Sequence, residues 1–187
     1  MTFERLHLTG PDGRPYVLGE RIEVHDRSAL IGRVQSVTPS PGGDAVRIEN
    51  FVSTDAADFR AKALPKLVLA EVVTFIAERY PSIHAIGIEL SRDIEGFEGR
   101  QATLASARAE ILQSIGTANV QVTPKPHAGQ AGHFAVTGVW HYDEASIAAL
   151  SAVLRTQREA YRERQAAEEA AAATPRPTLR QLLRRDR

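Results

Sequence analysis

The first candidate for chemistry is a carboxylate inside an apolar segment. Glu89 interrupts the run Ile83–Leu90, which is otherwise almost entirely apolar. A carboxylate in a strand that is covered on both faces needs a partner of opposite charge, which makes Glu89 a candidate for a functional role. Glu89 lies near the end of the run, where strands often meet water, so a solvated carboxylate is the alternative.

Histidines are the next candidates, because imidazole is a common metal ligand. His127, His133 and His141 lie close together in the sequence. His133 and His141 would share one face of an unbroken strand but would be about 26 Å apart along it, too far to share a metal. No Asp/Glu/His trio has metal-ligand spacing, so we expect no metal site. His84 is interpreted as an ordinary residue at the start of a strand.

Two aromatic residues, Phe134 and Trp140, are six positions apart and would share one face of a strand. A core role is expected for them, and stacking on a ligand is the alternative. Other chemistry lacks support: the chain has no cysteine and no G-x-S-x-G nucleophile elbow. Gly42 and Gly43 precede a strand rather than a helix, which indicates a turn and not a phosphate-binding loop.

Composition bounds the class of protein. The 187 residues leave room for one ordinary domain plus an appendage. Lys+Arg and Asp+Glu are both 23, so no global charge favours DNA or membranes. No apolar run approaches the roughly 20 residues of a membrane helix, and the start lacks a signal peptide. We expect a cytoplasmic protein, and the arginine-rich composition is typical of a GC-rich, bacterial genome.

The first part of the chain is predicted to form β-strands. Tyr16–Leu18 and Arg21–Val24 are short candidates, and Ala29–Val37 and Asp44–Ser53 are longer ones. In the last of these, alternation predicts Val46, Ile48 and Asn50 on one face and Arg47, Glu49 and Phe51 on the other. A three-strand antiparallel meander is the simplest arrangement.

Helical and strand periods then alternate. Helices are predicted over Pro65–Tyr80 and Ala102–Ile115, the second ended by Gly116, and strands over Ile83–Leu90, Asn119–Thr123 and His133–Tyr142. This order predicts an α/β domain with a mixed sheet, covering residues 1–142.

The C-terminal part differs in composition. Residues 143–173 are predicted to form one long helix, capped by Asp143, with a stripe of Ile147, Leu150, Leu154 and Tyr161 that packs its first half while its second half projects. Residues 174–187 form a Pro/Arg-rich amphipathic tail. Its Leu179, Leu182 and Leu183, flanked by Arg180 and Arg184, have the form of a docking peptide for a protein partner, a second copy of the chain or an acidic membrane surface. A frayed terminus is the alternative, and five basic residues without an interleaved aromatic are a weak signal for nucleic-acid binding.

The stretch Asp44–Tyr142 resembles the GNAT acyltransferase family. In that family a strand, here Val46–Ser53, leads into a pyrophosphate-binding loop R/Q-x-x-G-x-G/A and then a helix. The loop falls on Arg60, Ala61, Lys62, Ala63, Leu64 and Pro65, with Lys66 opening the helix, and Ile83–Leu90 is the splayed next strand. The resemblance implies a mixed, mostly antiparallel sheet flanked by helices.

The resemblance also implies a chemistry, the transfer of an acyl group from acyl-CoA to an amine. It places CoA on residues 60–64 and Lys66, and the general base on Glu49, with Asp55 as the next candidate. Phe134 and Trp140 would line the acyl or acceptor side. The sequence departs from the family pattern at Ala63 and Pro65, which replace glycines, and at Leu112, which stands at the position of a tyrosine acid. The two helices that usually shape the acceptor site have little room before Arg21.

Two functions follow as alternatives. The first is a catalytically degenerate GNAT-like scaffold that binds another macromolecule through its C-terminal helix and tail. The second is an acyl-CoA-dependent N-acyltransferase with an atypical pyrophosphate loop. Whether the chain is an enzyme stays open at the level of the sequence.

Overall fold

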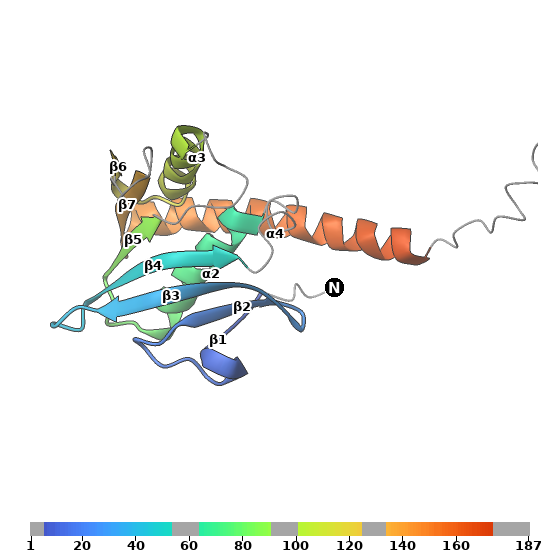
Figure 1. The fold of residues 1–187 in the computed structure, drawn as a ribbon, viewed down its shortest axis with the longest axis horizontal. Coiled ribbons are helices and arrows are strands. Elements are labelled where there is room, and N and C mark those ends of the chain that lie inside the picture. The colour runs from blue at the N-terminus through green and yellow to red at the C-terminus, as the bar shows by residue number, and fades with distance from the viewer. Residues whose placement is uncertain (1–5, 54–63, 91–100, 125–133, 174–187) are drawn as a thin grey trace, which may run out of the picture.

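The computed structural model describes residues 6–53, 64–90, 101–124 and 134–173. These residues form one seven-stranded sheet in the order β1-β2-β3-β4-β5-β7-β6 (Figure 1). The strands are β1 (His7–Thr9), β2 (Ile22–Asp26), β3 (Ala29–Pro39), β4 (Ala45–Ser53), β5 (Ala85–Leu90), β6 (Ala118–Pro124) and β7 (Phe134–His141). The helices are the single turn η1 (Pro11–Gly13), α2 (Leu64–Arg79), α3 (Gln101–Ser114) and α4 (Glu144–Ala173).

The sheet is mixed and mostly antiparallel, as expected. β1 to β4 form an antiparallel meander, and β5, β7 and β6 form a second antiparallel group. The two groups meet at β4 and β5, which are parallel. A parallel pair needs a crossover connection, and α2 provides it. The fold therefore has one parallel seam in its centre, between two strands that come from different halves of the sheet.

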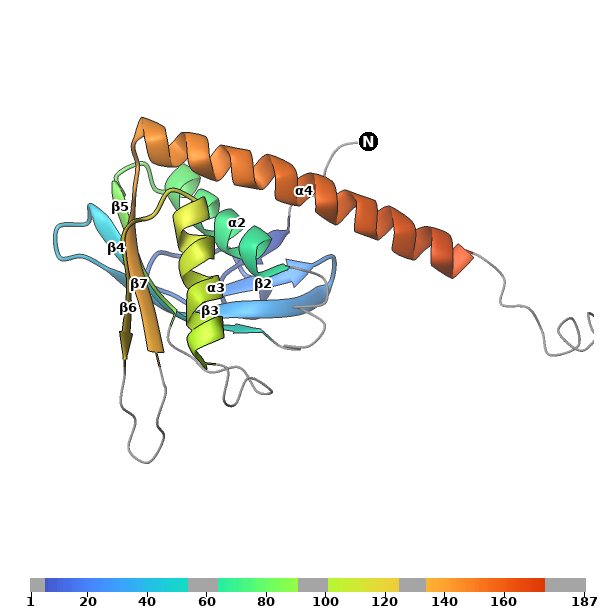
Figure 2. The same cartoon turned by 90° about the horizontal axis from the view of Figure 1, so that it is seen from above.

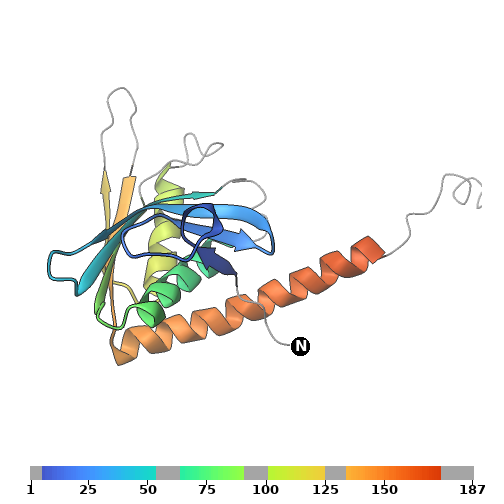
Figure 3. The same cartoon turned by 90° about the horizontal axis from the view of Figure 1, so that it is seen from below.

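All three α-helices lie on the same side of the sheet. Figure 2 shows α2, α3 and α4 together beside β5 and β7, and the view from below in Figure 3 shows β1 to β4 in front of α2 and α3. α2 is buried around most of its circumference, because the sheet covers it on one side and α4 packs against it on another. One core connects these layers, with Ile22, Val46, Ile86 and Trp140 from the strands and Val72 from α2.

Most predicted elements are confirmed to within a few residues, but one predicted strand is wrong and one strand was not predicted. Tyr16–Leu18 is not a strand: the ring of Tyr16 packs against Phe75 of α2 and Tyr80 just after it, at centroid distances of 5.5 and 6.0 Å. The first strand is instead His7–Thr9, which the sequence pattern did not indicate. Burial of one aromatic ring, rather than alternation, explains the apolar character around Tyr16.

The alternation predicted for β4 holds only up to Glu49. Val46 and Ile48 are buried as expected, but Asn50 is exposed and has a φ of 57°. Asparagine tolerates this left-handed conformation better than most residues. The backbone turn at Asn50 ends the regular alternation, so the predicted grouping of Asn50 with the core face is wrong.

The long helix α4 begins as predicted. The N–H of Ser146 donates to Oδ1 of Asp143 at 2.8 Å, which makes Asp143 the N-cap and holds its pKa below the ordinary value. Leu150, Leu154 and Tyr161 are buried, whereas Ile147 is exposed, against the prediction.

The second half of α4 stays on the domain further than predicted. The hydroxyl of Tyr161 donates to Asp26, and Arg27 pairs with Glu169 at 2.8 Å, so the helix is tied to the turn between β2 and β3. Residues 166–171 are exposed. None of the helices in the described part of the chain has the length and apolar content that crossing a membrane requires.

Candidate functional site

The parallel seam between β4 and β5 ends at a pair of carboxylates. The two strands pair from Ala45↔Ala85 to Glu49↔Glu89, and no pairing between them follows. β5 continues with Leu90 paired to β7, while Asn50 of β4 takes a positive φ and β4 continues beside β3 alone to Ser53. The strands therefore part directly after Glu49 and Glu89, and the last two side chains of the seam lie next to each other on one face.

Arg47 joins these two carboxylates. Its Nε lies 2.6 Å from Oε1 of Glu49, and its Nη2 donates to Oε2 of Glu89. Glu89 has only 8% of its side chain exposed, against 28% for Glu49 and 58% for Arg47. A buried carboxylate without a cation would be costly, so Arg47 provides the compensating charge that the sequence pattern required.

The side chain of Arg47 lies over Gly87 of β5. Arg47 and Gly87 are paired in the parallel seam, and a Cβ built on Gly87 would lie 3.7 Å from Cγ of Arg47. The side chain of Arg47 therefore passes over a position without a side chain before it meets Glu89. The Arg47–Glu49–Glu89 cluster is held by two strands and one bridging guanidinium.

The cluster lies on the side of the sheet away from the α-helices. Val46 and Ile48 point into the core with α2, so the alternating Arg47 and Glu49 point to the other side. Between β1 and β2 the described chain forms only the turn η1, which agrees with the expectation that two helices have little room there. In the part of the chain that the structure describes, no α-helix covers the cluster.

The predicted pyrophosphate loop falls mostly outside the described residues. Arg60, Ala61, Lys62 and Ala63 lie outside them, as does Asp55. Leu64 opens α2 and is only 1% exposed, so it belongs to the core. Lys66 is half-buried in the first turn, which contains no acidic residue. A helix start with one lysine, and without a carboxylate, has the chemistry that a phosphate group requires.

The other predicted residues do not join the cluster. His84 and His141 are exposed, and His127 and His133 lie outside the described residues. Within the described ranges no group of three His, Cys, Asp or Glu side chains has metal-binding geometry.

The two aromatic candidates, Trp140 and Phe134, differ in their burial. Trp140 is buried on the helix side of the sheet, where its Nε1 donates to the carbonyl of Ile115 at 3.1 Å, so its expected core role is confirmed. Phe134 is half-buried at the start of β7. Leu112, at the position where the family pattern has a tyrosine, is fully buried.

Arg47 is the member of the cluster that sequence reasoning missed. It is two positions before Glu49, and alternation already placed both on one face of β4. The link to Glu89 depends on β4 and β5 being neighbours and in register, which no local pattern reveals. The sequence signal that could have indicated Arg47 is its position two residues before the candidate base Glu49 on the same strand.

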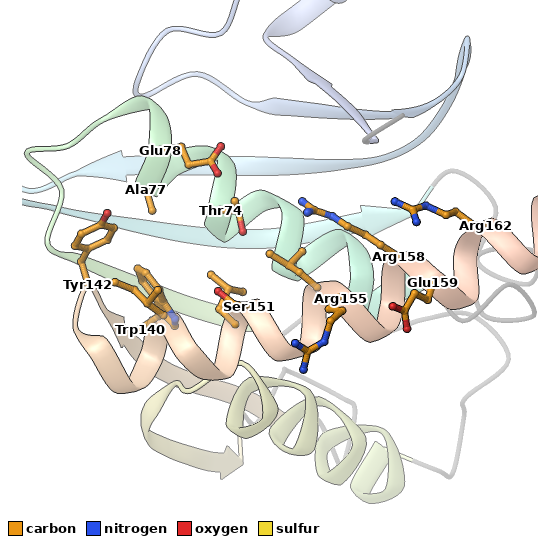
Figure 4. Close-up of a pocket in the computed structure, with 13 residues that line it drawn as sticks. Thr74, Ala77, Glu78, Trp140, Tyr142, Ser151, Arg155, Arg158, Glu159 and Arg162 are labelled. Atoms are coloured by element: carbon orange, nitrogen blue, oxygen red, sulfur yellow. The ribbon is translucent and has the colours of Figure 1, made fainter. Parts of the chain in front are cut away.

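A groove lies on the opposite side of the sheet from the cluster, between α2 and α4. It has a volume of about 550 Å³ (Figure 4). Arg158 of α4 spans it and holds Glu71 of α2 with two hydrogen bonds, Nε to Oε1 at 2.7 Å and Nη2 to Oε2 at 2.9 Å. Glu71 is buried, so this bidentate pair fixes the position of Arg158.

Comparison with known proteins gives similarity of fold. No family model and no curated protein sequence matches the chain. A Bacillus subtilis acetyltransferase in complex with CoA is 12% identical with a TM-score of 0.45, covering 67% of this chain and 78% of its own.

Two further solved structures are similar to the same degree. A probable acetyltransferase from Staphylococcus epidermidis is 12% identical with a TM-score of 0.46, covering 67% of this chain and 69% of its own. The ribosomal-protein-S18-alanine N-acetyltransferase from Escherichia coli is 10% identical with a TM-score of 0.45, covering 66% and 69%. At these identities the likeness concerns the arrangement of elements alone.

Proposed function

We propose that this chain is an acyl-CoA-dependent N-acyltransferase whose reaction takes place where β4 and β5 part. The observation that carries the proposal is the Arg47–Glu49–Glu89 cluster at the last paired residues of the parallel seam. The GNAT resemblance of the sequence implies a base at Glu49 and a CoA site at the start of α2. β4 carries Glu49 and is followed in the chain by α2, so the proposed base and the proposed CoA site belong to the same β4–α2–β5 unit.

Glu49 is assigned as the general base. Of the two carboxylates it has the larger exposed fraction, so an incoming ammonium group can reach it, whereas Glu89 lies deeper. Glu49 takes one proton from the ammonium group, and the resulting amine nitrogen forms the new C–N bond with the thioester carbonyl. The thioester C–S bond breaks in the same transfer; its electron pair leaves with the sulfur, which takes the second proton that the nitrogen loses and departs as the thiol. Acyl-CoA supplies the activated carbonyl.

Arg47 and Glu89 are assigned positioning roles. Arg47 contacts both carboxylates, so it fixes the orientation of Glu49 through a bond anchored on the buried Glu89. Such anchoring reduces the number of orientations that the base can adopt. Lys66 and the first turn of α2 would hold the pyrophosphate, together with Arg60 and Lys62 from the preceding segment. Pro65 donates no N–H there, so side-chain charge contributes more of the binding than in a glycine-rich loop.

Glu49→Gln tests the assignment of the base. The variant should lower turnover of an amine acceptor by about a hundredfold to ten-thousandfold, because general-base catalysis contributes that range. Its affinity for CoA should stay close to that of the unaltered chain, since Glu49 is not at the start of α2. Glu110→Gln, an exposed carboxylate on α3, is the matched control and should leave both quantities unchanged. Normal turnover by Glu49→Gln would remove Glu49 from this role.

A second candidate function is the catalytically degenerate scaffold. The exposed residues 166–171 of α4, which lead to the tail, favour it. In that role Leu179, Leu182 and Leu183, with Arg180 and Arg184, would contact a protein partner or a second copy of the chain; these five residues lie outside the described part. Serine at all three leucines, or truncation after Ala173, should abolish recovery of that partner. Unchanged recovery would exclude the tail as the docking element.

A further inference from the structure

The groove between α2 and α4 is separate from the Arg47–Glu49–Glu89 cluster. Trp140 lines the groove and pairs with Ile86 on the helix side of the sheet, whereas Glu89 points to the other side. Successive residues of a strand alternate between faces, so the sheet itself lies between the two places. A ligand in the groove would therefore not meet the residues assigned to acyl transfer.

One end of the groove is apolar and exposed. Four large hydrophobic side chains in the described part of the chain are exposed, and two of them, Tyr142 at 52% and Ile147 at 38%, line this groove. Trp140 lies beside them, with its ring 6.0 Å from that of Tyr142 in an edge-to-face arrangement. Ala77 of α2 contributes a small apolar side chain to the lining of the groove (Figure 4). Clustered exposed apolar side chains mark a binding surface more often than isolated ones do.

The other end of the groove is basic. Arg155, Arg158 and Arg162 are spaced i, i+3 and i+7 on α4, so they share one side of the helix. Glu71 holds Arg158 in place, while Arg155 is exposed and its guanidinium makes no hydrogen bond or ion pair with any described residue. Glu159 is the acidic lining residue among these three arginines, so cations outnumber anions at this end of the groove. The other acidic lining residue, Glu78, lies on the last turn of α2.

The two ends define the size and character of an occupant. Ile147 and Arg158 are eleven residues apart on α4, which is about 16 Å along the helix. The volume of about 550 Å³ is that of a small-molecule site rather than of a protein interface. Arginine binds carboxylates with fork geometry, and its pairing with Glu71 already shows this at Arg158.

We propose that the groove between α2 and α4 binds a small amphipathic carboxylate, with an apolar chain or ring system beside Trp140, Tyr142 and Ile147 and its anionic group at Arg155. This site does not depend on the proposed acyl transfer. The apolar body covers the exposed side chains at one end, and the carboxylate pairs with the arginine that lacks a partner among the described residues.

Trp140 provides the measurement, because it is the only tryptophan in the chain. The full chain is titrated with dodecanoate below its micelle concentration, and the fluorescence of Trp140 is recorded. The proposal predicts a saturable change with a stoichiometry of one. Dodecyltrimethylammonium, which has the same chain and the opposite charge, is the matched control and should bind at least about tenfold more weakly, since the charged hydrogen bond is lost.

Two variants locate the ligand. Arg155→Glu should weaken dodecanoate binding about tenfold or more, while Arg164→Glu, on another side of the same helix, should not. Tyr142→Ala should weaken binding through the apolar end, and it keeps the test valid if Arg155→Glu folds poorly. The proposal is overturned by an absence of saturable change, by equal binding of the cationic control, or by unchanged affinity in both Arg155→Glu and Tyr142→Ala.

Discussion

Arg47 satisfies a requirement that Glu89 imposes on the fold. The apolar strand around Glu89 predicts that this carboxylate needs a cation, and the structure provides it from β4, 42 residues earlier in the chain. That Glu89 needs a cation could be predicted from the sequence, because the need follows from burial. Which residue provides the cation could not be predicted, because that depends on which strand lies next to β5 and in which register.

Glu71 of α2 is also a buried carboxylate that is compensated by an arginine of another element, Arg158 of α4. Arg158→Met should lower the free energy of unfolding by about 3 kcal/mol, because it leaves the buried carboxylate of Glu71 without its bidentate partner. Urea denaturation with a two-state analysis measures this loss.

A double variant separates charge from packing at this pair. Glu71→Leu combined with Arg158→Met should recover most of the lost stability, because two apolar side chains of similar size remove the uncompensated charge. If the double variant is less stable than Arg158→Met alone, the ion pair is not the origin of the effect.

Tyr161 makes the stability of the protein sensitive to alkaline pH. Burial raises its pKa above the ordinary value of 10.0, and the hydrogen bond to Asp26 raises it further. The folded state therefore favours the neutral hydroxyl, and this contribution is present below about pH 10 and is lost as the pH rises above that value. Between about pH 9 and 11 the urea midpoint should fall more steeply for the unaltered chain than for Tyr161→Phe.

Tyr16, whose pKa burial also raises, is present in both chains of this comparison, so its effect cancels. Equal slopes in the two chains would contradict the assignment to Tyr161.

At the scale of elements, the hydrophobic periods predicted most of the fold. The two helices and the three strands after Pro65 are found within a few residues of their predicted ends, because Pro65, Pro81 and Gly116 mark the ends of the helices. The misses have local causes. Tyr16 supplies one buried ring without forming a strand, and Asn50 takes a positive φ inside β4. A single residue with unusual backbone geometry leaves no periodic signal.

Gly116 fixes the connection between α3 and β6. Its φ of 84° is the left-handed cap predicted from the sequence, and a Cβ there would lie 2.8 Å from Cα of Ser146 at the start of α4. Gly116→Ala should therefore destabilise the protein by about 2–4 kcal/mol, from backbone strain plus the clash with α4.

Gly43→Ala is the matched control for this position. Gly43 also has a positive φ, 70°, but a Cβ there would meet nothing within 4 Å. It should cost only about 1 kcal/mol, which is the backbone term alone. Thermal unfolding of the two variants compares them directly, and equal losses would show that the contact with α4 does not matter.

At the scale of the whole molecule, the sheet separates two surfaces with different chemistry. The Arg47–Glu49–Glu89 cluster lies on the side without α-helices, and the groove lies among α2 and α4 (Figure 4). Glu49 and Glu89 were predicted as separate candidates, and only the parallel pairing of β4 and β5 brings them together. The groove combines residues of α2, β7 and α4 that no motif connects, so it could not be predicted from the sequence.

The proposed function requires that the chain bind acyl-CoA, and thermal unfolding with and without millimolar acetyl-CoA measures this binding. A ligand at about 100 times its dissociation constant adds about 2.7 kcal/mol to the stability of the folded state. For a chain of this size that predicts a rise in Tm of roughly 5–10 °C. An unchanged Tm at saturating acetyl-CoA would contradict the proposed function and leave the scaffold as the remaining function.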